Sequence, residues 1–336
     1  TVYDRANNSS TVEKIINIDK QVPTVTITRD KVSSTSDNGK GWNKDTLTYT
    51  VVAKDATSGI KAENENPVIN YYIYLGGKKM KTGKVNVIDK KLDASGAYTE
   101  VVGNITISKD KAYDSNNLTI DVDTVDVAGN KSVSSADTTV TAKYDFTAPT
   151  AKLKLQQGVD GDKWFTNGAT FTVTAQDKTS GIEKVGYTIK KADGTYVEGS
   201  ADAPVELITG VESDAKEYTN SISIPDMADY DTGNLTITTY TYDFAGNKTV
   251  CSQTIKLDTT NPTADLTVNA GANQDGWFNS GATLSVKASD ETSGVDRVEY
   301  IVKASKDSNE NLTSGTLTAD TLQKSDNGDL TGTITI

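Results

Sequence analysis

Eight aspartates recur at matching places in the chain and offer the clearest chemistry. Each lies in one of three contexts: a linker shortly before a proline, a loop of the form Asp-x-Thr-Ser-Gly, or a turn of the form Asp-x-Ala-Gly-Asn. The eight residues are Asp19, Asp55, Asp126, Asp145, Asp177, Asp243, Asp258 and Asp290. Carboxylates gathered with loop carbonyl oxygens are the ligands that a hard cation such as Ca²⁺ prefers. If the fold brings them together, they are candidate calcium ligands.

A simpler interpretation needs no metal. An Asp side chain accepts hydrogen bonds from backbone amides two or three residues further on, and a glycine supplies the left-handed position that many turns require. The spacing Asp-x-Thr-Ser-Gly is satisfied by such a cap alone, and no spacing typical of an EF-hand occurs. Turn capping is therefore the favoured role of these residues, calcium is the alternative, and no other cofactor is expected.

The residue types argue against catalysis. The chain has no histidine and one cysteine, Cys251, so the usual serine or cysteine nucleophile with a histidine base cannot be assembled. Cys251 aligns with Val12 in the terminal strand of another repeat, which is typical of a small buried hydrophobic position. Every prominent carboxylate recurs with its repeat, whereas a catalytic site is normally single. The sequence predicts that the protein is not an enzyme.

A repeated framework positions these residues. The three tryptophans, Trp42, Trp164 and Trp277, recur at a nearly even spacing, and each precedes the aspartate of an Asp-x-Thr-Ser-Gly loop by the same interval. Linker prolines precede them at Pro23, Pro149 and Pro262. Repeats as long as these predict separate domains rather than one solenoid.

The same alignment predicts the domain boundaries. We expect residues 1–18 to be the last strand of a preceding repeat, because Asp4–Asn8 matches the Asp-x-Ala-Gly-Asn turn with Asn7 in place of glycine. Residues 332–336 match 220–224, and the turn expected after them does not follow. The predicted divisions are 1–18 as a terminal strand, 19–144 as repeat one, 145–257 as repeat two and 258–336 as a truncated repeat three. The chain is predicted to be a fragment of a longer array.

Alternation of apolar and polar residues predicts half-buried antiparallel strands. Apolar residues take every second position after each tryptophan, and a second alternating segment follows the Asp-x-Thr-Ser-Gly loop. The first set is Leu47, Tyr49, Val51 and Ala53; Ala169, Phe171, Val173 and Ala175; and Ala282, Leu284, Val286 and Ala288. About seven strands per repeat predict an all-β chain of tandem immunoglobulin-like Greek-key β-sandwiches, arranged as beads on a string. In this fold the Asp177 loop and the Asp243 turn lie at one pole, near the linker, so Asp145, Asp177 and Asp243 should converge. Asp19, Asp55 and Asp126 should converge in the same way in repeat one.

These motifs resemble bacterial immunoglobulin-like repeats. The resemblance rests on the Asp-x-x-Ser-Gly loop, the Asp-x-Ala-Gly-Asn turn and linkers such as Asp258-Thr-Thr-Asn-Pro-Thr263. Such repeats occur in large surface adhesins and cell-wall-associated proteins, so the resemblance implies an extracellular, cell-surface or secreted module. It implies a stalk or extender that contacts the neighbouring repeats of its own chain.

Two other functions remain open. The modules themselves could bind a host surface protein, an immunoglobulin or a glycan, or the chain could be an accessory region of a secreted carbohydrate-active enzyme. Repeat one has an insertion that includes residues 62–67 and is expected to lengthen its Asp55 loop. The enlarged loop is compatible with direct binding. The net charge of −12 argues against a nucleic-acid partner, and no apolar stretch is long enough to insert into a membrane. We expect the tryptophans to serve packing rather than sugar stacking.

Overall fold

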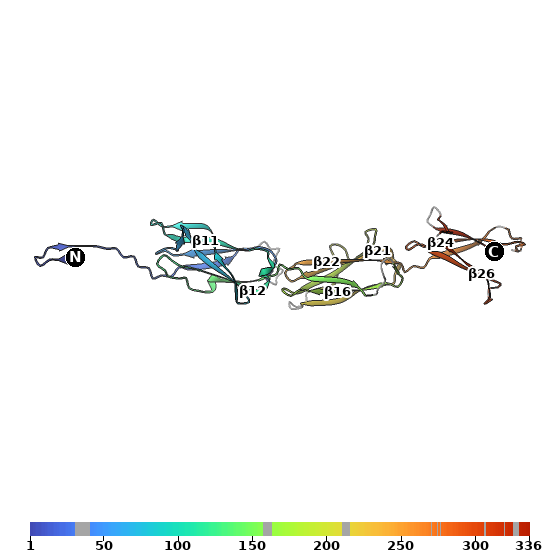
Figure 1. Ribbon diagram of the computed structural model, residues 1–336, viewed down its shortest axis with the longest axis horizontal. Coiled ribbons are helices and arrows are strands. Elements are labelled where there is room, and N and C mark those ends of the chain that lie inside the picture. Colours follow the sequence, from blue (N-terminus) through green and yellow to red (C-terminus); the bar gives the residue numbers. More distant parts are fainter. Residues whose placement is uncertain are drawn as a thin grey trace.

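The computed structural model describes residues 1–30, 41–156, 163–209, 216–269, 271–273, 275, 277–305, 307–318, 320–324 and 329–336. Within these ranges the structure is built from β-strands, and the helical segments are three single 3₁₀ turns, η1 (Lys111–Tyr113), η2 (Ala136–Thr138) and η3 (Ala228–Tyr230). Three β-bodies follow one another along the long axis of the molecule, with the N-terminal segment extending from one end (Figure 1). The predicted all-β fold class is confirmed.

The first body contains two packed sheets. One sheet has the order β10-β11-β5-β3 and the other β4-β13-β12-β8-β9. The strands are β3 (Thr24–Arg29), β4 (Trp42–Asn43), β5 (Leu47–Lys54), β8 (Ile69–Leu75), β9 (Lys78–Lys84), β10 (Asn86–Leu92), β11 (Tyr98–Ile107), β12 (Ser115–Thr124) and β13 (Thr139–Tyr144). Since β5 pairs with β11 while β8 pairs with β12, the chain crosses between the sheets as a Greek key does.

The second body repeats this topology. The smaller sheet has the order β14-β16-β20, and the larger one β15-β22-β21-β17-β18 with β19 also pairing with β17. The strands are β14 (Thr150–Leu155), β15 (Trp164–Phe165), β16 (Ala169–Gln176), β17 (Ile182–Lys190), β18 (Tyr196–Glu198), β19 (Val205–Thr209), β20 (Glu217–Ile224), β21 (Thr232–Asp243) and β22 (Lys248–Leu257). In both bodies the short strand that begins with tryptophan pairs in parallel with the last strand.

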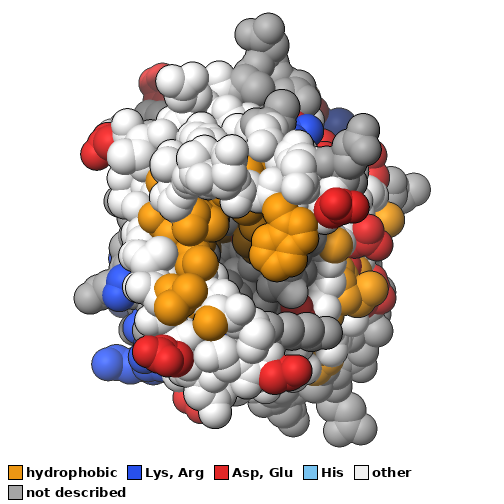
Figure 2. All heavy atoms as spheres, turned by 90° about the vertical axis from the view of Figure 1, so that its right-hand side faces the viewer, with side chains coloured by type: hydrophobic (Ala, Val, Ile, Leu, Met, Phe, Trp, Pro, Cys, Tyr) orange, Lys and Arg blue, Asp and Glu red, His pale blue; other side chains and the backbone are white. Residues whose placement is uncertain are grey.

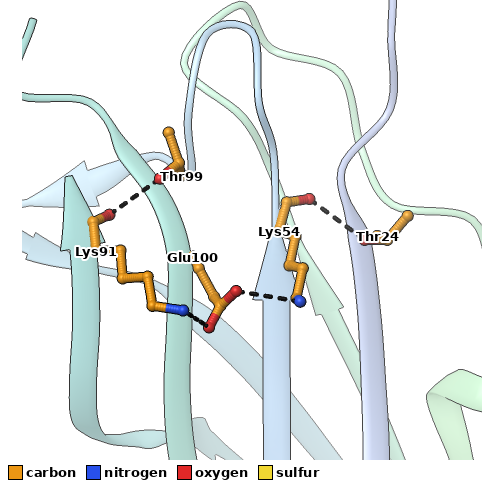
Figure 3. A network of polar contacts seen from close by, with 5 residues as sticks. All are labelled: Thr24, Lys54, Lys91, Thr99 and Glu100. Atoms are coloured by element: carbon orange, nitrogen blue, oxygen red, sulfur yellow. Dashed lines mark hydrogen bonds and ion pairs between the residues drawn. The ribbon is translucent and has the colours of Figure 1, made fainter. Parts of the chain in front are cut away.

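Each of these two bodies closes its own hydrophobic core, as the alternating pattern predicts. One cluster of buried side chains runs from Val25 to Tyr144 and the other from Leu153 to Leu257. The inward positions of β5 and β16 are all buried, and Val51 and Phe171 are fully enclosed. The outward positions carry polar residues, such as Glu100, which bridges Lys54 and Lys91 across the outer face of the first sheet (Figure 3).

The third body has fewer strands among the residues that the structure describes. Its strands are β23 (Thr263–Val268), β24 (Thr283–Ser289), β25 (Arg297–Lys303), β26 (Asn311–Thr318), β27 (Gln323–Lys324) and β28 (Leu330–Thr335), in sheets ordered β23-β24-β28-β27 and β25-β26. Gly332 pairs with Val286 as Asn220 pairs with Val173. The predicted match of residues 332–336 to 220–224 therefore has the same register in both repeats.

The N-terminal segment forms a small hairpin of β1 (Val2–Tyr3) and β2 (Ser9–Ser10). Its register, Val2 opposite Ser10 and Tyr3 opposite Ser9, is that of Thr241 opposite Thr249 and Tyr242 opposite Lys248 at the end of the β21–β22 pair. Asn7 has a positive φ, the left-handed conformation that Gly246 adopts at the same place. The hairpin is thus preformed although its residues are exposed.

The insertion in repeat one is a second hairpin rather than a longer Asp55 loop. It consists of β6 (Ala62–Glu63) and β7 (Asn66–Pro67), with Asn64 and Glu65 both at positive φ, as a tight two-residue turn requires. The hydroxyl of Tyr98 donates to the carbonyl of Glu65 at 2.6 Å and ties the hairpin to the body. Nowhere in the part of the chain that the structure describes is there a helix that could cross a membrane.

Candidate cation sites at the junctions between repeats

The junction between repeats one and two brings three predicted aspartates together. Asp145 follows β13, Asp177 follows β16, and Asp243 ends β21, so the sheet topology delivers all three to one pole of repeat two. All three residues are buried, and one carboxylate oxygen from each lies within 4.8 Å of the others. Two oxygens bound to the same calcium ion lie at most about 5 Å apart, because each Ca–O distance is about 2.4 Å. The predicted convergence is present, with a spacing that suits calcium.

Turn capping is also present, and it occupies only part of each carboxylate. Asp177 Oδ1 accepts from the amides of Thr179 at 3.1 Å and Gly181 at 2.7 Å. Asp243 Oδ1 accepts from the amide of Asn247 at 2.8 Å, while Oδ2 accepts from the Asn247 side-chain amide at 2.8 Å. Each carboxylate oxygen has more than one acceptor direction. Capping and cation binding are therefore compatible here, and whether a cation binds stays a prediction.

Asp145 connects the two repeats as well as the cluster. Its backbone amide donates to the carbonyl of Asn43 in repeat one at 2.9 Å, and its Oδ2 accepts from the amide of Ser180 in repeat two at 2.9 Å. Its own carbonyl accepts from the side chain of Asn247 at 2.9 Å. Asp145 is thus hydrogen-bonded to residues of both repeats.

Burial shifts the acid–base chemistry of this cluster. Removal from water raises the pKa of Asp243 to about 7, and the nearby carboxylates of Asp145 and Asp177 push it in the same direction, against the Asn247 hydrogen bonds. Burial likewise raises the pKa of Asp145 to about 6, against the hydrogen bond that it accepts from the amide of Ser180. Three buried acids that repel one another fit a cation, which would favour their charged forms.

The neutral oxygens near the cluster also fit a cation. Ser180 is fully buried, and its hydroxyl oxygen has no hydrogen-bond partner, although its backbone amide is bonded to Asp145. A buried hydroxyl without a partner is uncommon in folded proteins and calls for a ligand, an ion or a water molecule. The residues present would supply Ca²⁺ with carboxylates from Asp145, Asp177 and Asp243, and Ser180 adjoins them through its amide bond to Asp145.

Repeat one has an equivalent cluster in a different setting. Asp19, Asp55 and Asp126 have carboxylate oxygens within 4.8 Å of one another, and Asp55 and Asp126 are buried while Asp19 is half-buried. The amide of Ser58 donates to Asp19 Oδ2 at 3.1 Å and to Asp55 Oδ1 at 2.9 Å. Hydrogen bonding from Ser58 lowers the pKa of Asp19, the opposite direction from Asp145. The linker aspartate is thus more exposed to solvent in repeat one, where no repeat packs against the cluster, than in repeat two.

Repeat three contains the linker aspartate and the loop aspartate of the cluster, Asp258 and Asp290. The amide of Ser293 donates to Asp258 Oδ2 at 3.0 Å and to Asp290 Oδ1 at 2.8 Å, as Ser58 does in repeat one. The sequence contains no Asp-x-Ala-Gly-Asn motif after Asn247 to supply a third carboxylate. Asp258 and Asp290 are therefore brought together without the partner that Asp126 and Asp243 provide.

Trp42 packs at the junction rather than in the core of its own repeat. It forms a separate buried cluster with Phe244 and Ala245, the two central residues of the Asp-x-Ala-Gly-Asn turn in repeat two. Beside it, Lys44 Nζ donates to the carbonyl of Gly246 at 2.6 Å. The packing role predicted for the tryptophans holds for Trp42 but is wrong for Trp277, which is 75% exposed.

Two functional aspartates were not predicted from the sequence. Asp114 accepts the amide of Phe146 at 2.7 Å and the hydroxyl of Thr147, and so clamps the linker that leaves repeat one. Asp231 accepts the amide of Thr259 at 2.9 Å and the hydroxyl of Thr260 at 2.7 Å in the linker that leaves repeat two. Each follows a tyrosine at the end of a 3₁₀ turn, so a recurring Tyr-Asp-Ser/Thr motif could have revealed them.

Cys251 lies in β22 and is half-buried against the core of repeat two. Its thiol donates weakly to the carbonyl of Ala151 at 3.3 Å. The prediction that Cys251 occupies a small buried hydrophobic position is confirmed in part, because one side of the residue packs against the core.

Comparison with known proteins agrees with this fold. Residues 143–259 match the sequence profile of the family described as "Bacterial Ig-like domain". No curated protein sequence matches the chain. Domains of this kind are generally non-catalytic.

Solved structures resemble the chain at low identity. The chain is 17% identical to the crystallised tetra-tandem repeat in the extending region of a large adhesion protein, covering 100% of this chain and 70% of that one with a TM-score of 0.31. It is 16% identical to a Ca²⁺-stabilized adhesin that helps an Antarctic bacterium reach out and bind ice, covering 99% of this chain and 79% of that one with a TM-score of 0.32. At these TM-scores the likeness carries no information on function. Over residues 143–259, the profile match confirms the resemblance to bacterial immunoglobulin-like repeats that the sequence predicted.

Proposed function

We propose that this chain is a non-catalytic extender of a bacterial surface or secreted adhesin, in which bound calcium stiffens the joints between successive repeats. The observation that supports the proposal best is the recurrence of one joint. In repeats one and three, one serine amide donates to both the linker aspartate and the loop aspartate. Ser58 donates to Asp19 and Asp55, and Ser293 donates to Asp258 and Asp290. In repeat two the equivalent amide, that of Ser180, donates to the linker residue Asp145. A feature built at every joint serves the array, whereas a substrate site would occur once.

The electrostatics explain why a cation would matter. Without it, the joint between repeats one and two holds three carboxylates in a buried space, and their mutual repulsion opposes closure. A divalent ion shared by the linker, the Asp177 loop and the Asp243 turn would replace this repulsion by attraction. It would also connect elements that otherwise meet only through hydrogen bonds such as that from Ser180 to Asp145.

The test is the response of the chain to calcium. We expect millimolar Ca²⁺ added to chelated protein to raise the melting temperature and to narrow the distribution of maximum dimensions measured by small-angle X-ray scattering. Asp177→Asn should remove most of both effects, because an amide keeps the cap but loses the charge. Asp193→Asn is the matched control, since Asp193 caps an exposed turn in the same repeat. An unchanged melting temperature in the parent protein would refute the calcium part of the proposal.

A second candidate function is direct binding of a host surface protein, immunoglobulin or glycan. The observation that favours it is the β6–β7 hairpin, which projects from repeat one and has no counterpart among the described strands of repeat two. Immobilised chain exposed to immunoglobulins, mucin and matrix proteins should show saturable binding if this function applies. Replacing Asn64 and Glu65 with a Gly-Gly turn should then weaken it. Absence of binding leaves the extender role.

A further inference from the structure

The outer face of the larger sheet of repeat one is hollowed beside β8 and β12, over a volume of about 320 Å³. The strand residues around this hollow alternate with the buried Ile73 and Ile120, so their side chains point away from the core. The charged and aromatic residues that line it are Tyr72, Tyr74, Lys79, Asp121, Asp123 and Lys131. Among the described residues, it shares none with the aspartate cluster of repeat one. The hollow is therefore separate from the candidate cation site.

An insertion specific to repeat one forms one wall of the hollow. Repeat one has 14 residues, 131–144, between its Asp-x-Ala-Gly-Asn turn and the next linker aspartate, whereas repeat two has 10, residues 248–257. β22 pairs with β21 along this segment, but β13 pairs with β12 only from Thr139 onward. The intervening residues leave the sheet, and Ser134 and Thr138 from this segment line the hollow. The wall is thus an addition to the shared template.

Internal hydrogen bonds hold both the wall and the floor in place. In the wall, the hydroxyl of Thr138 donates to the carbonyl of Ser135 at 2.9 Å and accepts from the amide of Ser135 at 3.0 Å. In the floor, Asp123 accepts from the side chains of Asn70 at 3.0 Å, Tyr72 at 3.2 Å and Lys131 at 2.8 Å. A site that is already ordered loses less conformational entropy when a ligand binds.

The floor residues also differ from those of repeat two. The strand registers show that the positions of Tyr72, Tyr74, Asp121 and Asp123 are occupied in repeat two by Thr188, Lys190, Thr238 and Tyr240, respectively. The hollow on the equivalent face of repeat two has no carboxylate among its described lining residues. Features common to the repeats serve the array, whereas an insertion and four changed residues at one place indicate a role restricted to repeat one.

The lining of the hollow favours a neutral, hydrogen-bonding ligand. Its charged groups are two carboxylates and two ammonium groups, so their formal charges cancel. Lys79 Nζ lies 4.6 Å from the ring centre of Tyr72 and 5.8 Å from that of Tyr74, so a ligand meets ammonium and hydroxyl groups rather than bare ring faces. This lining differs from the end of the molecule that carries repeat three, where hydrophobic side chains gather on the surface (Figure 2). The hydroxyls of a neutral saccharide can donate to carboxylates and accept from ammonium groups.

We propose that this hollow binds a neutral saccharide unit, with Asp121 accepting from its hydroxyls and Lys131 donating to them. Asp121 Oδ1 accepts from the hydroxyl of Thr139 at 2.8 Å, and each carboxylate oxygen has more than one acceptor direction. Asp123 is a positioning residue, because it holds Tyr72 and Lys131. The proposal rests on the second candidate function, direct binding, and narrows it to one ligand class and one site.

The test is binding of the labelled chain to an array of neutral, sialylated and sulfated oligosaccharides, in EGTA so that calcium plays no part. We expect saturable binding within the neutral set. Asp121→Ala should weaken it at least about tenfold, because hydrogen bonds to a charged group are the stronger kind. Asp89→Ala is the matched control, since it removes the same charge at an exposed site in β10 of the same repeat. No binding to neutral members, or equal binding by the two variants, would overturn the proposal.

A second variant separates the site from the fold. Tyr72→Thr combined with Asp121→Thr introduces the residues that repeat two carries at these positions, where the same pair of strands forms. This double variant should keep the melting temperature within a few degrees of the parent and lose the saccharide binding. Full binding by the double variant would contradict the site.

Failure of this inference can be told apart from failure of direct binding. Saccharide binding that is lost when Asn64 and Glu65 become Gly-Gly, but kept in Asp121→Ala, would overturn the hollow and favour the β6–β7 hairpin. Saturable binding to an unglycosylated host protein without binding to the array would overturn the saccharide and leave direct binding in place.

Discussion

The two complete aspartate clusters contain the same residue types in the same turns and differ in what covers them. Around Asp145, Asp177 and Asp243, the preceding repeat closes the site, all three acids are buried, and burial raises the pKa of Asp145 and Asp243. Around Asp19, Asp55 and Asp126, the preceding residues 1–18 stay exposed, and hydrogen bonding lowers the pKa of Asp19. The local motif builds the cluster, and the neighbouring repeat determines its electrostatics.

The largest expected effect separates a buried tryptophan from an exposed one. Trp42→Ala should lower the free energy of unfolding by about 3 kcal/mol, because it leaves a cavity against the buried Phe244 and Ala245. Trp277→Ala should have a much smaller effect on this free energy, since that side chain is exposed. Urea denaturation of both variants checks this. Equal losses would mean that the tryptophans act within their own repeats.

Calcium should affect the closed cluster more than the half-open one. At a free concentration about 100 times the dissociation constant, a single bound ion stabilises the folded state by about 2.7 kcal/mol. Hydrogen exchange can report the two repeats separately, through the amides of β5 and β16. Asp177→Asn should remove the calcium-dependent protection of β16 and leave that of β5, and Asp55→Asn should do the reverse. If one substitution removed the calcium-dependent protection of both β5 and β16, the two clusters would be coupled.

The pH response between pH 8 and pH 5, in the absence of divalent ions, should differ between the two repeats. Asp145 and Asp243 have folded pKa values of about 6 and about 7, above the ordinary value of 3.8, so folded repeat two binds more protons than the unfolded chain between about pH 4 and 7. Its stability should therefore rise by about 1–3 kcal/mol as the pH falls from about 8 to about 5.

Asp19 provides the contrast in repeat one. The pKa of Asp19 in the folded state lies below the ordinary value. Its contribution to the stability of repeat one is therefore present at neutral pH and is lost only as the pH falls through that lowered pKa. Hydrogen exchange of β5 and β16, measured at pH 8 and pH 5, reports the pH responses of repeat one and repeat two separately. Protection of β16 that falls toward pH 5 would contradict the assignment of raised pKa values to its cluster.

The smallest effect concerns the hydrogen bond between Lys44 and the carbonyl of Gly246. Lys44→Ala should lower the free energy of unfolding of repeat two by about 1 kcal/mol. Lys109→Ala is the control, because Lys109 is exposed in repeat one. The two variants are compared by urea denaturation. No difference between them would show that packing of Phe244 on Trp42 holds the junction by itself.

The sequence predicted those features that local pattern controls. Alternation in β5 and β16 identified their buried positions, and the recurring loops identified acids that do converge at one pole. It did not predict that Trp42 packs on Phe244 of the following repeat, because contacts between repeats leave no periodic signal in either one. The clamps at Asp114 and Asp231 were missed for a related reason, since their partners lie in linkers distant in the sequence. The contrast between the two clusters depends on burial, which only the assembled junction reveals.

The short strands β4 and β15 have a mechanical consequence. Each runs parallel to the last strand of its repeat, so Lys143 pairs beside Trp42 and Lys256 beside Trp164. When a pulling force acts along the molecule, the strands of such a pair are drawn in opposite directions along their common axis, and their hydrogen bonds must yield in shear together rather than one at a time. A protein tethered at one end and loaded at the other would thereby hold its repeats folded against tension.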